Sequence, residues 1–134
     1  MPRSALVAQR SRRVPKILVV DDAPDTRLVH TRLLYAAGME VFTAENGTAA
    51  LHVVRRAAPD VIVTDIQMPV MDGLELCRQI RADATTRDVV VIAVTGDACD
   101  GGRAALAAGC DAVLEKPCGR TELLATIRCL LERR

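Results

Sequence analysis

The sequence predicts an α/β fold in which five parallel strands alternate with helices in a doubly wound (βα)5 sheet. Two observations predict it: short runs of aliphatic and β-branched residues recur along the chain, and the segments between them carry apolar stripes at helical spacing. One strand-plus-helix unit of roughly 20–30 residues separates successive runs, as in sheets whose parallel strands are joined by helices. The predicted strands are Ile17–Val20, Glu40–Thr43, Val61–Thr64, Val89–Val94 and Ala112–Leu114.

Three of these runs, Ile17–Val20, Val61–Thr64 and Val89–Val94, are almost continuously apolar. Strands covered by helices on both faces have this pattern, which favours a parallel sheet. The run Glu40–Thr43 alternates polar and apolar residues instead. We therefore expect it to form a less covered strand at an edge of the sheet.

Capping residues mark the first three helical segments. Pro24 stands early in the first segment and Gly38 ends it, while Asn46 opens the second and Asp72 opens the third. Proline in a first turn, glycine after a last turn, and Asn or Asp at the N-cap are the residues that these positions favour. A leucine-rich stripe over residues 123–131 indicates the last helix.

The fourth helical segment has a weak start. Gly101 and Gly102 stand side by side at its beginning, and each glycine inside a helix costs ~1 kcal/mol relative to alanine. We expect this helix to be short or mobile.

Length and composition restrict the class of protein. A chain of 134 residues, half of them apolar and 26% charged, has the size of one globular domain. No apolar run approaches the ~18 residues that a membrane-spanning helix needs, so we expect no membrane partner. Only Tyr35 and Phe42 are aromatic. Because single-stranded nucleic-acid binders stack bases on aromatic side chains, we expect no nucleic-acid partner.

Charge is distributed unevenly along the chain. Residues 1–16 contain five basic residues and no acidic one, which leaves 13 of the 18 basic residues against all 17 acidic ones in the remainder. We predict a basic, disordered tail over residues 1–14, followed by one domain over residues 15–134.

The cysteines and histidines indicate neither a zinc site nor a disulfide framework. Five cysteines, an odd number with no C-x-x-C pair, argue against both and favour a reducing, cytoplasmic compartment. We interpret the cysteines as small buried hydrophobic residues, with Cys118 beside Lys116 as the best candidate for a reactive thiol. His30 and His52 are interpreted as ordinary surface or core residues.

Polar side chains follow the predicted strands at their carboxyl ends. Asp21 and Asp22 follow the first strand, Asp65 the third, Thr95 the fourth, and Lys116 comes shortly after the fifth. Each of them alone is most often a turn, capping or surface residue. Because ligands of open parallel sheets bind beyond the carboxyl ends of the strands, we expect the five side chains to converge.

This set has the chemistry of a phosphoryl-transfer site. Clustered carboxylates raise one another's pKa unless a counter-charge is present. Mg²⁺ is a suitable counter-charge because it prefers carboxylate, carbonyl and water oxygens. A lysine ammonium and a threonine hydroxyl, such as those of Lys116 and Thr95, bind phosphoryl oxygens.

With their neighbours, these residues resemble the receiver domain of two-component response regulators over residues 15–133. The resemblance depends on Asp21-Asp22, the run TDIQMPVMDG at Thr64–Gly73, Thr95-Gly96 and Lys116-Pro117. It implies a flavodoxin-like sheet with strand order 2-1-3-4-5.

The resemblance also implies a role for each site residue. Asp65 would accept a phosphoryl group from a phosphohistidine on a histidine kinase or histidine phosphotransfer protein. Thr95 and Lys116 would bind the phosphoryl oxygens. The cofactor would be Mg²⁺, with Mn²⁺ as the alternative ion. Its protein ligands would be Asp21, Asp22, Asp65 and the backbone carbonyl of Gln67.

Further positions have implied supporting roles. Gly73 and Pro117 would be structural, and the family often has a cis peptide bond at the position of Pro117. Gln67 and Asp97 would influence how fast the acyl phosphate is hydrolysed, because both flank the phosphoryl site.

The chain departs from the family pattern on the output side. Val113, three residues before Lys116, stands at the switch position where the family commonly has Tyr or Phe. Cys118 stands where the family commonly has Phe after the Lys-Pro pair. These differences affect how phosphorylation is coupled to output and leave the acceptor chemistry intact.

The resulting hypothesis is a stand-alone signalling receiver that is not an enzyme, apart from catalysing its own phosphorylation and dephosphorylation. It would act on an effector protein through its fourth helix, fifth strand and fifth helix. A phosphorelay intermediate or a phosphate sink are alternatives, as is a protein-binding scaffold that is never phosphorylated. An aspartyl-nucleophile phosphatase is disfavoured, because Asp65 is followed two positions later by Gln67 and not by the second Asp of D-x-D-x-T.

Overall fold

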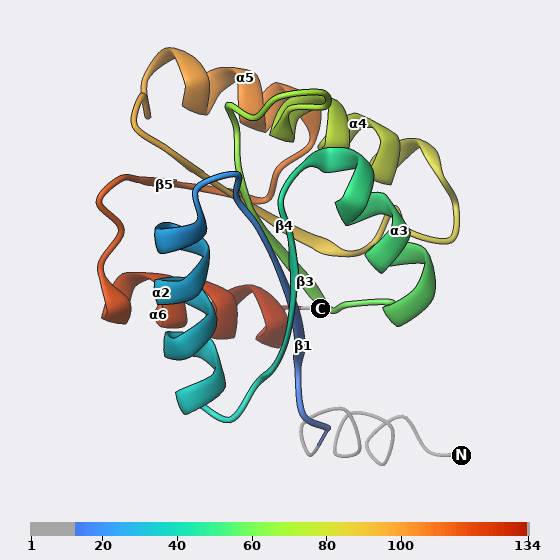
Figure 1. Cartoon of the computed structure of the whole chain (residues 1–134). Helices are drawn as coiled ribbons and strands as arrows, with labels where there is room; N and C mark the ends of the chain where they lie inside the picture. Colours follow the sequence, from blue (N-terminus) through green and yellow to red (C-terminus); the bar gives the residue numbers. More distant parts are fainter. Residues whose placement is uncertain (1–12, 134) are drawn as a thin grey trace.

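Five parallel strands form a single sheet in the order β2-β1-β3-β4-β5 in the computed structural model, which describes residues 13–133 (Figure 1). The predicted doubly wound, flavodoxin-like sheet with strand order 2-1-3-4-5 is therefore confirmed. Residues 1–12 of the expected basic tail lie outside the described part of the chain. The strands are β1 (Lys16–Val20), β2 (Glu40–Ala44), β3 (Val61–Asp65), β4 (Val90–Thr95) and β5 (Ala112–Glu115).

The helices cover both faces of this sheet. In Figure 1, α2 and α6 lie on one face, and α3, α4 and α5 lie on the other. Among the described residues, no helix has the length and apolar character required to cross a membrane. The helices are α2 (Pro24–Ala36), α3 (Gly47–Ala57), α4 (Gly73–Ala82), α5 (Asp100–Ala108) and α6 (Arg120–Glu132).

Successive side chains of each strand enter two separate hydrophobic cores. Leu18 of β1 packs in the core beneath α3, α4 and α5 together with Leu76, whereas the preceding Ile17 packs with Leu34 and Ile127 beneath α2 and α6. All five side chains are 0% exposed. Burial on both faces explains why the central strands are continuously apolar in sequence.

The edge position of β2 agrees with its mixed composition. Its residues are mostly half-buried or exposed, whereas β1 and β3 are buried almost throughout. The predicted strand boundaries are correct to within one residue, with one shift at each end of β4. That strand begins at Val90, because the N–H of Val89 donates to the Thr86 carbonyl in the preceding turn. It continues to Thr95, which pairs with Glu115.

Two of the predicted helix caps are formed. The Asn46 side chain accepts the Ala49 N–H at 2.8 Å, and the Asp72 side chain accepts the Glu75 N–H at 2.9 Å. Helix α5 has 9 residues and is the shortest of the described helices, as expected from its glycines. Its N-cap residue, Cys99, makes no side-chain capping bond.

The prediction that all cysteines are buried is wrong for part of the set. Cys77 and Cys110 are buried, but Cys99 and Cys129 are exposed, because Cys99 lies at the start of α5 and Cys129 lies on the outer side of α6. Burial raises the pKa of the half-buried Cys118 thiol. This shift disfavours the thiolate and argues against Cys118 as a reactive cysteine.

Asp60 joins the amino ends of the strands. Its carboxylate accepts the Lys16 N–H at 2.8 Å and is hydrogen-bonded to the Arg13 guanidinium. The carbonyl of Asp60 accepts the Val90 N–H at 3.2 Å. Because it is only 4% exposed, Asp60 fixes β1, β3 and β4 to one another from inside the protein.

Arg81 links α4 to the segments that lead into the amino ends of β4 and β5. Its guanidinium donates to the carbonyls of Gly109 (2.9 Å), Arg87 (2.6 Å) and Val89 (2.5 Å), and it pairs with the Asp111 carboxylate at 2.9 Å. The Asp111 carboxylate also accepts a backbone N–H from the sheet. One side chain thus satisfies three loop carbonyls that the helices and strands leave unpaired.

We predict that Arg81→Met lowers the free energy of unfolding by about 2–4 kcal/mol, because three carbonyls and one carboxylate lose their donor. Urea denaturation measures the difference. The matched control is Arg78→Met on the same helix, where an exposed guanidinium meets Glu75 at 3.4 Å. An exposed pair of this kind contributes less than about 1 kcal/mol. Equal losses in the two variants would show that the three carbonyl bonds add nothing to stability.

Candidate functional site

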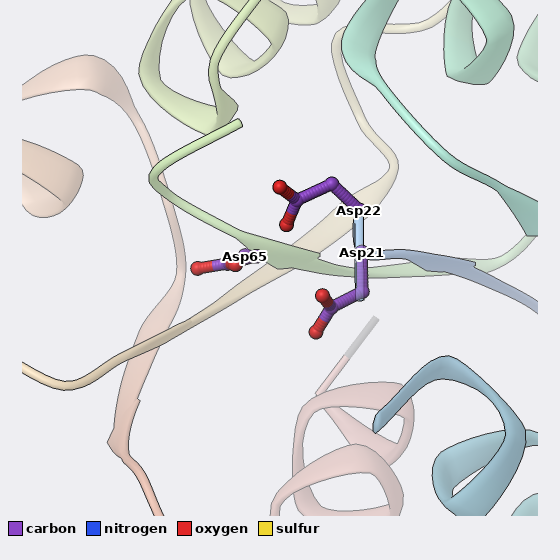
Figure 2. Close-up of side chains that lie close together, drawn as sticks. All are labelled: Asp21, Asp22 and Asp65. Carbon is purple, nitrogen blue, oxygen red and sulfur yellow. The ribbon is translucent and has the colours of Figure 1, made fainter. Parts of the chain in front are cut away.

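The three predicted carboxylates meet at the carboxyl edge of the sheet. Strands β1 and β3 are neighbours, with Val20 paired to Thr64, so the residues that follow them emerge side by side. Carboxylate oxygens of Asp21, Asp22 and Asp65 all lie within 4.8 Å of one another. In Figure 2, Asp21 and Asp22 extend from the end of β1, and Asp65 extends from the end of β3. Asp21 is buried and Asp22 is exposed.

Lys116 supplies a positive charge to this cluster. Its Nζ lies 3.2 Å from Oδ2 of Asp65 and 3.7 Å from Oδ2 of Asp21. The backbone holds the lysine in place, because the Lys116 N–H donates to the Thr95 carbonyl at 2.8 Å. The peptide bond between Lys116 and Pro117 is cis, as the resemblance implies. The predicted convergence of acidic residues and lysine is therefore confirmed.

The environment of Asp65 balances two opposed effects. Burial raises the pKa of the Asp65 carboxyl above its ordinary value, while the hydrogen bond and the charge of Lys116 act in the opposite direction. The nearby Asp21 carboxylate adds to the rise. The Lys116 ammonium thus favours the ionised, nucleophilic form of Asp65.

A cavity of about 250 Å³ opens beside Asp65. Thr95 is 6% exposed, and its Oγ1 accepts the Asp97 N–H at 3.1 Å. The Asp97 carboxylate is itself occupied as an acceptor of the Asp100 N–H at 3.2 Å. The cavity is lined by Asp65, Gln67, Thr95, Gly96, Asp97 and Lys116.

Gly73 positions the loop that follows Asp65. A Cβ at Gly73 would lie 2.2 Å from the Asp65 carbonyl oxygen, and the Gly73 N–H donates to the Ile66 carbonyl at 2.8 Å. A side chain cannot be accommodated at this distance, which supports the structural role predicted for Gly73. Val70, at the tip of the loop, has φ +71°, a left-handed conformation that costs energy for a β-branched residue.

Two further residues, Gly47 and Arg27, support the site, although the sequence alone did not indicate this role. Gly47, at the start of α3, contacts the loop so closely that a Cβ there would lie 2.7 Å from Met71 Cγ. The Gly47 N–H donates to the Met71 carbonyl at 3.1 Å. Arg27 donates from Nη1 to the Asp21 carbonyl at 2.7 Å. The Asn46 cap locates the helix start at Gly47, but only the folded chain shows which loop it contacts.

Val113 lies apart from the cavity. It is half-buried on β5, paired with Ala93, and it packs at the edge of the core beneath α3, α4 and α5. Gly102 of α5 lies beside it, because a Cβ at that position would be 3.4 Å from Val113 Cγ1. The structure thus brings Asp65, the other two acidic residues and Lys116 together. It places the predicted switch residue, Val113, on β5 outside the lining of the cavity.

The donor set fits a hard divalent cation. Three carboxylates within 4.8 Å of one another carry more negative charge than the Lys116 ammonium neutralises. Carboxylate oxygens with access to solvent and to backbone carbonyls are the ligands that Mg²⁺ prefers.

Comparison with known proteins agrees with this geometry. The sequence pattern of the response regulator receiver domain matches residues 17–128. Response regulator MprA of Mycobacterium leprae (strain TN) is 43% identical over 119 residues, which cover 88% of this chain and 51% of that protein. The chain therefore spans about half the length of the curated relatives that it matches.

Solved structures share the fold. The receiver domain of sensor histidine kinase PA1611 from Pseudomonas aeruginosa PAO1 superposes with a TM-score of 0.84 at 33% identity, covering 90% of this chain and 99% of that one. That structure was solved with a magnesium ion coordinated in its active site cleft. Chemotaxis protein CheY4 of Vibrio cholerae gives a TM-score of 0.83 at 31% identity, covering 87% of this chain and 98% of that one.

A buried imidazole on α2 lies within electrostatic reach of the site. His30 is 8% exposed. Burial lowers its pKa below the ordinary value of 6.5; Asp21 opposes the shift, and Lys116 adds to it. The folded protein therefore favours the neutral imidazole, whereas the unfolded chain binds a proton as the pH falls through about 6.5. Stability from this group is complete above that pH and is lost as the pH falls toward the lowered pKa.

We predict that the free energy of unfolding falls between about pH 7.5 and pH 5.5, and that His30→Leu reduces this fall. Urea denaturation in Mg²⁺-free buffer across this range measures it. The matched control is His52→Leu, which removes an exposed histidine of α3 and is expected to retain the fall. An equally steep fall in His30→Leu would rule out the buried imidazole as its cause.

Proposed function

This chain belongs to the response regulator receiver domain family, and on that premise we propose that Asp65 accepts a phosphoryl group and thereby switches the domain between two signalling states. One observation carries the proposal. The Asp65 carboxylate faces a cavity, with Lys116 Nζ 3.2 Å away and two further carboxylates within 4.8 Å. If the pair of Lys116 and Asp65 were only structural, one carboxylate would be enough to partner the lysine. The two additional carboxylates beside a cavity would then have no role.

The chemistry at Asp65 is a phosphoryl transfer. The donor is a phosphohistidine on a histidine kinase or a histidine phosphotransfer protein. An Asp65 carboxylate oxygen forms a bond to phosphorus while the P–N bond breaks, and the electron pair of that bond remains on the imidazole nitrogen. Lys116 and Thr95 line the cavity that receives the phosphoryl oxygens. Positioning and charge neutralisation supply most of the catalysis in such transfers.

Asp21, Asp22, Asp65 and the Gln67 carbonyl are the residues that would hold Mg²⁺, with Mn²⁺ as the alternative ion. When bound, the cation would neutralise negative charge on the carboxylates and on the phosphoryl oxygens. Arg27 and the Ala23 N–H hold Asp21 in place, since Ala23 N donates to Asp21 Oδ1 at 2.9 Å.

Signal output requires a partner protein. We propose that the effector surface consists of α5, β5 and α6, because Val113 lies on β5 and α5 follows the segment that begins at Thr95, the end of β4. We propose that this signalling takes place in the cytoplasm. A phosphorelay intermediate and a phosphate sink are the alternative functions. A scaffold that is never phosphorylated is the weaker hypothesis, because it leaves the acidic cluster without a role. A phosphatase is also a weaker hypothesis, because Gln67 stands where an aspartyl-nucleophile phosphatase has its second Asp.

Incubation with Mg²⁺ and acetyl phosphate is expected to add one phosphoryl group to the parent chain and none to Asp65→Asn, because the amide lacks a nucleophilic carboxylate. Intact-mass spectrometry detects the adduct, and its loss at alkaline pH identifies an acyl phosphate. Asp88→Asn is the matched control, since it changes an exposed carboxylate at the amino end of β4.

Two results would contradict the proposal. If the parent chain shows no adduct while a control receiver is phosphorylated, the scaffold hypothesis is favoured. If phosphate is released with no accumulated adduct, the phosphatase hypothesis is favoured instead.

Gln67 and Asp97 border the phosphoryl site and are proposed to orient the water that hydrolyses the adduct. We predict that Gln67→Leu lengthens the lifetime of the phosphorylated protein several-fold, because an apolar side chain excludes that water. The decay of the adduct mass after removal of acetyl phosphate measures the lifetime. Gln79→Leu, the same change on α4 away from the cavity, is the control. An unchanged lifetime in Gln67→Leu would remove this role.

A further inference from the structure

Two of the five cysteines lie together in the core beneath α3, α4 and α5. Cys77 is on α4, and Cys110 follows α5 and precedes β5. The exposed fractions of Cys77 and Cys110 are 0% and 6%, and their thiols are hydrogen-bonded to each other. The remaining cysteines are exposed or half-buried. Folding thus brings two thiols that are far apart in the sequence into contact inside the protein.

Hydrogen bonds of neighbouring residues fix the position of this pair. Helices α4 and α5 lie side by side on one face of the sheet (Figure 1). Arg81 lies one helical turn after Cys77, and its Nε donates to the Gly109 carbonyl at 2.9 Å. Gly109 immediately precedes Cys110, whose N–H donates to the Ala105 carbonyl at 3.0 Å. Because residues four apart on a helix lie on the same face, the Arg81 bond independently places Cys77 beside Cys110.

The surroundings of the pair make the two thiols unequal. The hydrogen bond from Cys110 lowers the pKa of the Cys77 thiol below its ordinary value, against the effect of burial, and the charge of the Arg81 guanidinium assists. The same hydrogen bond, together with burial, raises the pKa of Cys110. Because the thiolate is the form that reacts with oxidants, Cys77 is the nucleophile of the pair and Cys110 is its resolving partner.

Burial limits which oxidants reach the pair. Neither thiol is exposed enough to react with a bulky disulfide, whereas a peroxide is small. The chain on either side of Cys110 borders solvent, because Gly109 is half-buried and Asp111 is exposed. Local opening of this segment, of the kind that folded proteins undergo, admits a peroxide to Cys77. The pair is therefore suited to slow oxidation by a peroxide and is protected from thiol–disulfide exchange.

We infer that Cys77 and Cys110 form a modification site, at which a peroxide generates an intramolecular disulfide between α4 and the segment before β5. The Cys77 sulfur forms a bond to one peroxide oxygen while the O–O bond breaks. The other oxygen leaves as water with the Cys77 proton, and Cys77 becomes a sulfenic acid.

The Cys110 sulfur then forms a bond to the Cys77 sulfur while the S–O bond breaks, and a second water leaves with the Cys110 proton. The two thiols lose two electrons in total, and one peroxide is reduced to two waters. None of the residues proposed for phosphorylation takes part, so the inference does not depend on the proposed function.

Intact-mass spectrometry of a variant that keeps only this pair tests the inference. In Cys99→Ser/Cys118→Ser/Cys129→Ser, incubation of the folded protein with hydrogen peroxide is expected to remove the mass of two hydrogen atoms and both free thiols. Dithiothreitol is expected to restore them. Digestion under non-reducing conditions is expected to give one linked pair of peptides, which contain Cys77 and Cys110. If this variant does not fold, the same digestion of the peroxide-treated parent chain identifies the bond.

Cys110→Ala in the same background is the matched control, because it removes the resolving thiol and leaves Cys77 in place. No linked peptide is expected. The mass is expected to rise by the mass of added oxygen atoms, because a sulfenic acid without a partner thiol is oxidised further.

Three results would overturn the inference. Both thiols of the pair could stay reduced while peroxide oxidises the exposed Cys129 of the parent chain. They could gain oxygen without becoming linked, or the linkage could join two copies of the chain. Asp65→Asn is expected to form the disulfide to the same extent as the parent chain, so a failure of the proposed phosphorylation would leave this result unchanged.

Discussion

Three carboxylates held together at one edge of a parallel sheet repel one another, and the rest of the structure has to withstand that repulsion. Lys116 offsets part of it, at 3.2 Å from Asp65 and 3.7 Å from Asp21. The strands that carry the carboxylates cannot move apart, because β1 and β3 are paired and buried on both faces. The remaining negative charge makes the edge a site for a cation and a phosphoryl group.

Contacts remote from the carboxylates keep this edge in shape. Asp60 ties the strands together at their opposite end, and Gly47 and Gly73 leave space for the loop after the acceptor. Arg81 fixes the segment after α5, whereas at the start of that helix Asp97 accepts the Asp100 N–H and the N-cap residue Cys99 makes no side-chain capping bond. Rigid support beneath the site is thus combined with a first turn of α5 that contains two consecutive glycines, Gly101 and Gly102.

Much of the fold follows from local sequence. The pattern of apolar residues predicted the strands to within a residue and the edge position of β2. The residue types predicted the caps at Asn46 and Asp72. Local sequence decides all of these features. The convergence of the carboxylates and Lys116 was predictable because ligands of open parallel sheets bind beyond the carboxyl ends of the strands. Contacts made only by folding were not predictable: the Gly47 contact with Met71 and the several acceptors of Arg81 join residues far apart in the chain. The exposed Cys99 and Cys129 were mispredicted, because a cysteine's residue type does not determine the face on which it lies.

The close approach of Gly47 to Met71 has a consequence for mutational tolerance. If every position were substituted in turn, substitutions of Gly47 would abolish signalling, as substitutions of the acidic residues would. Gly47 nevertheless contributes no atom to the chemistry. Asp22, which is exposed, would in turn tolerate many substitutions in an assay of folding and few in an assay of phosphorylation. Comparing the two scans would therefore separate residues that shape the site from residues that react in it.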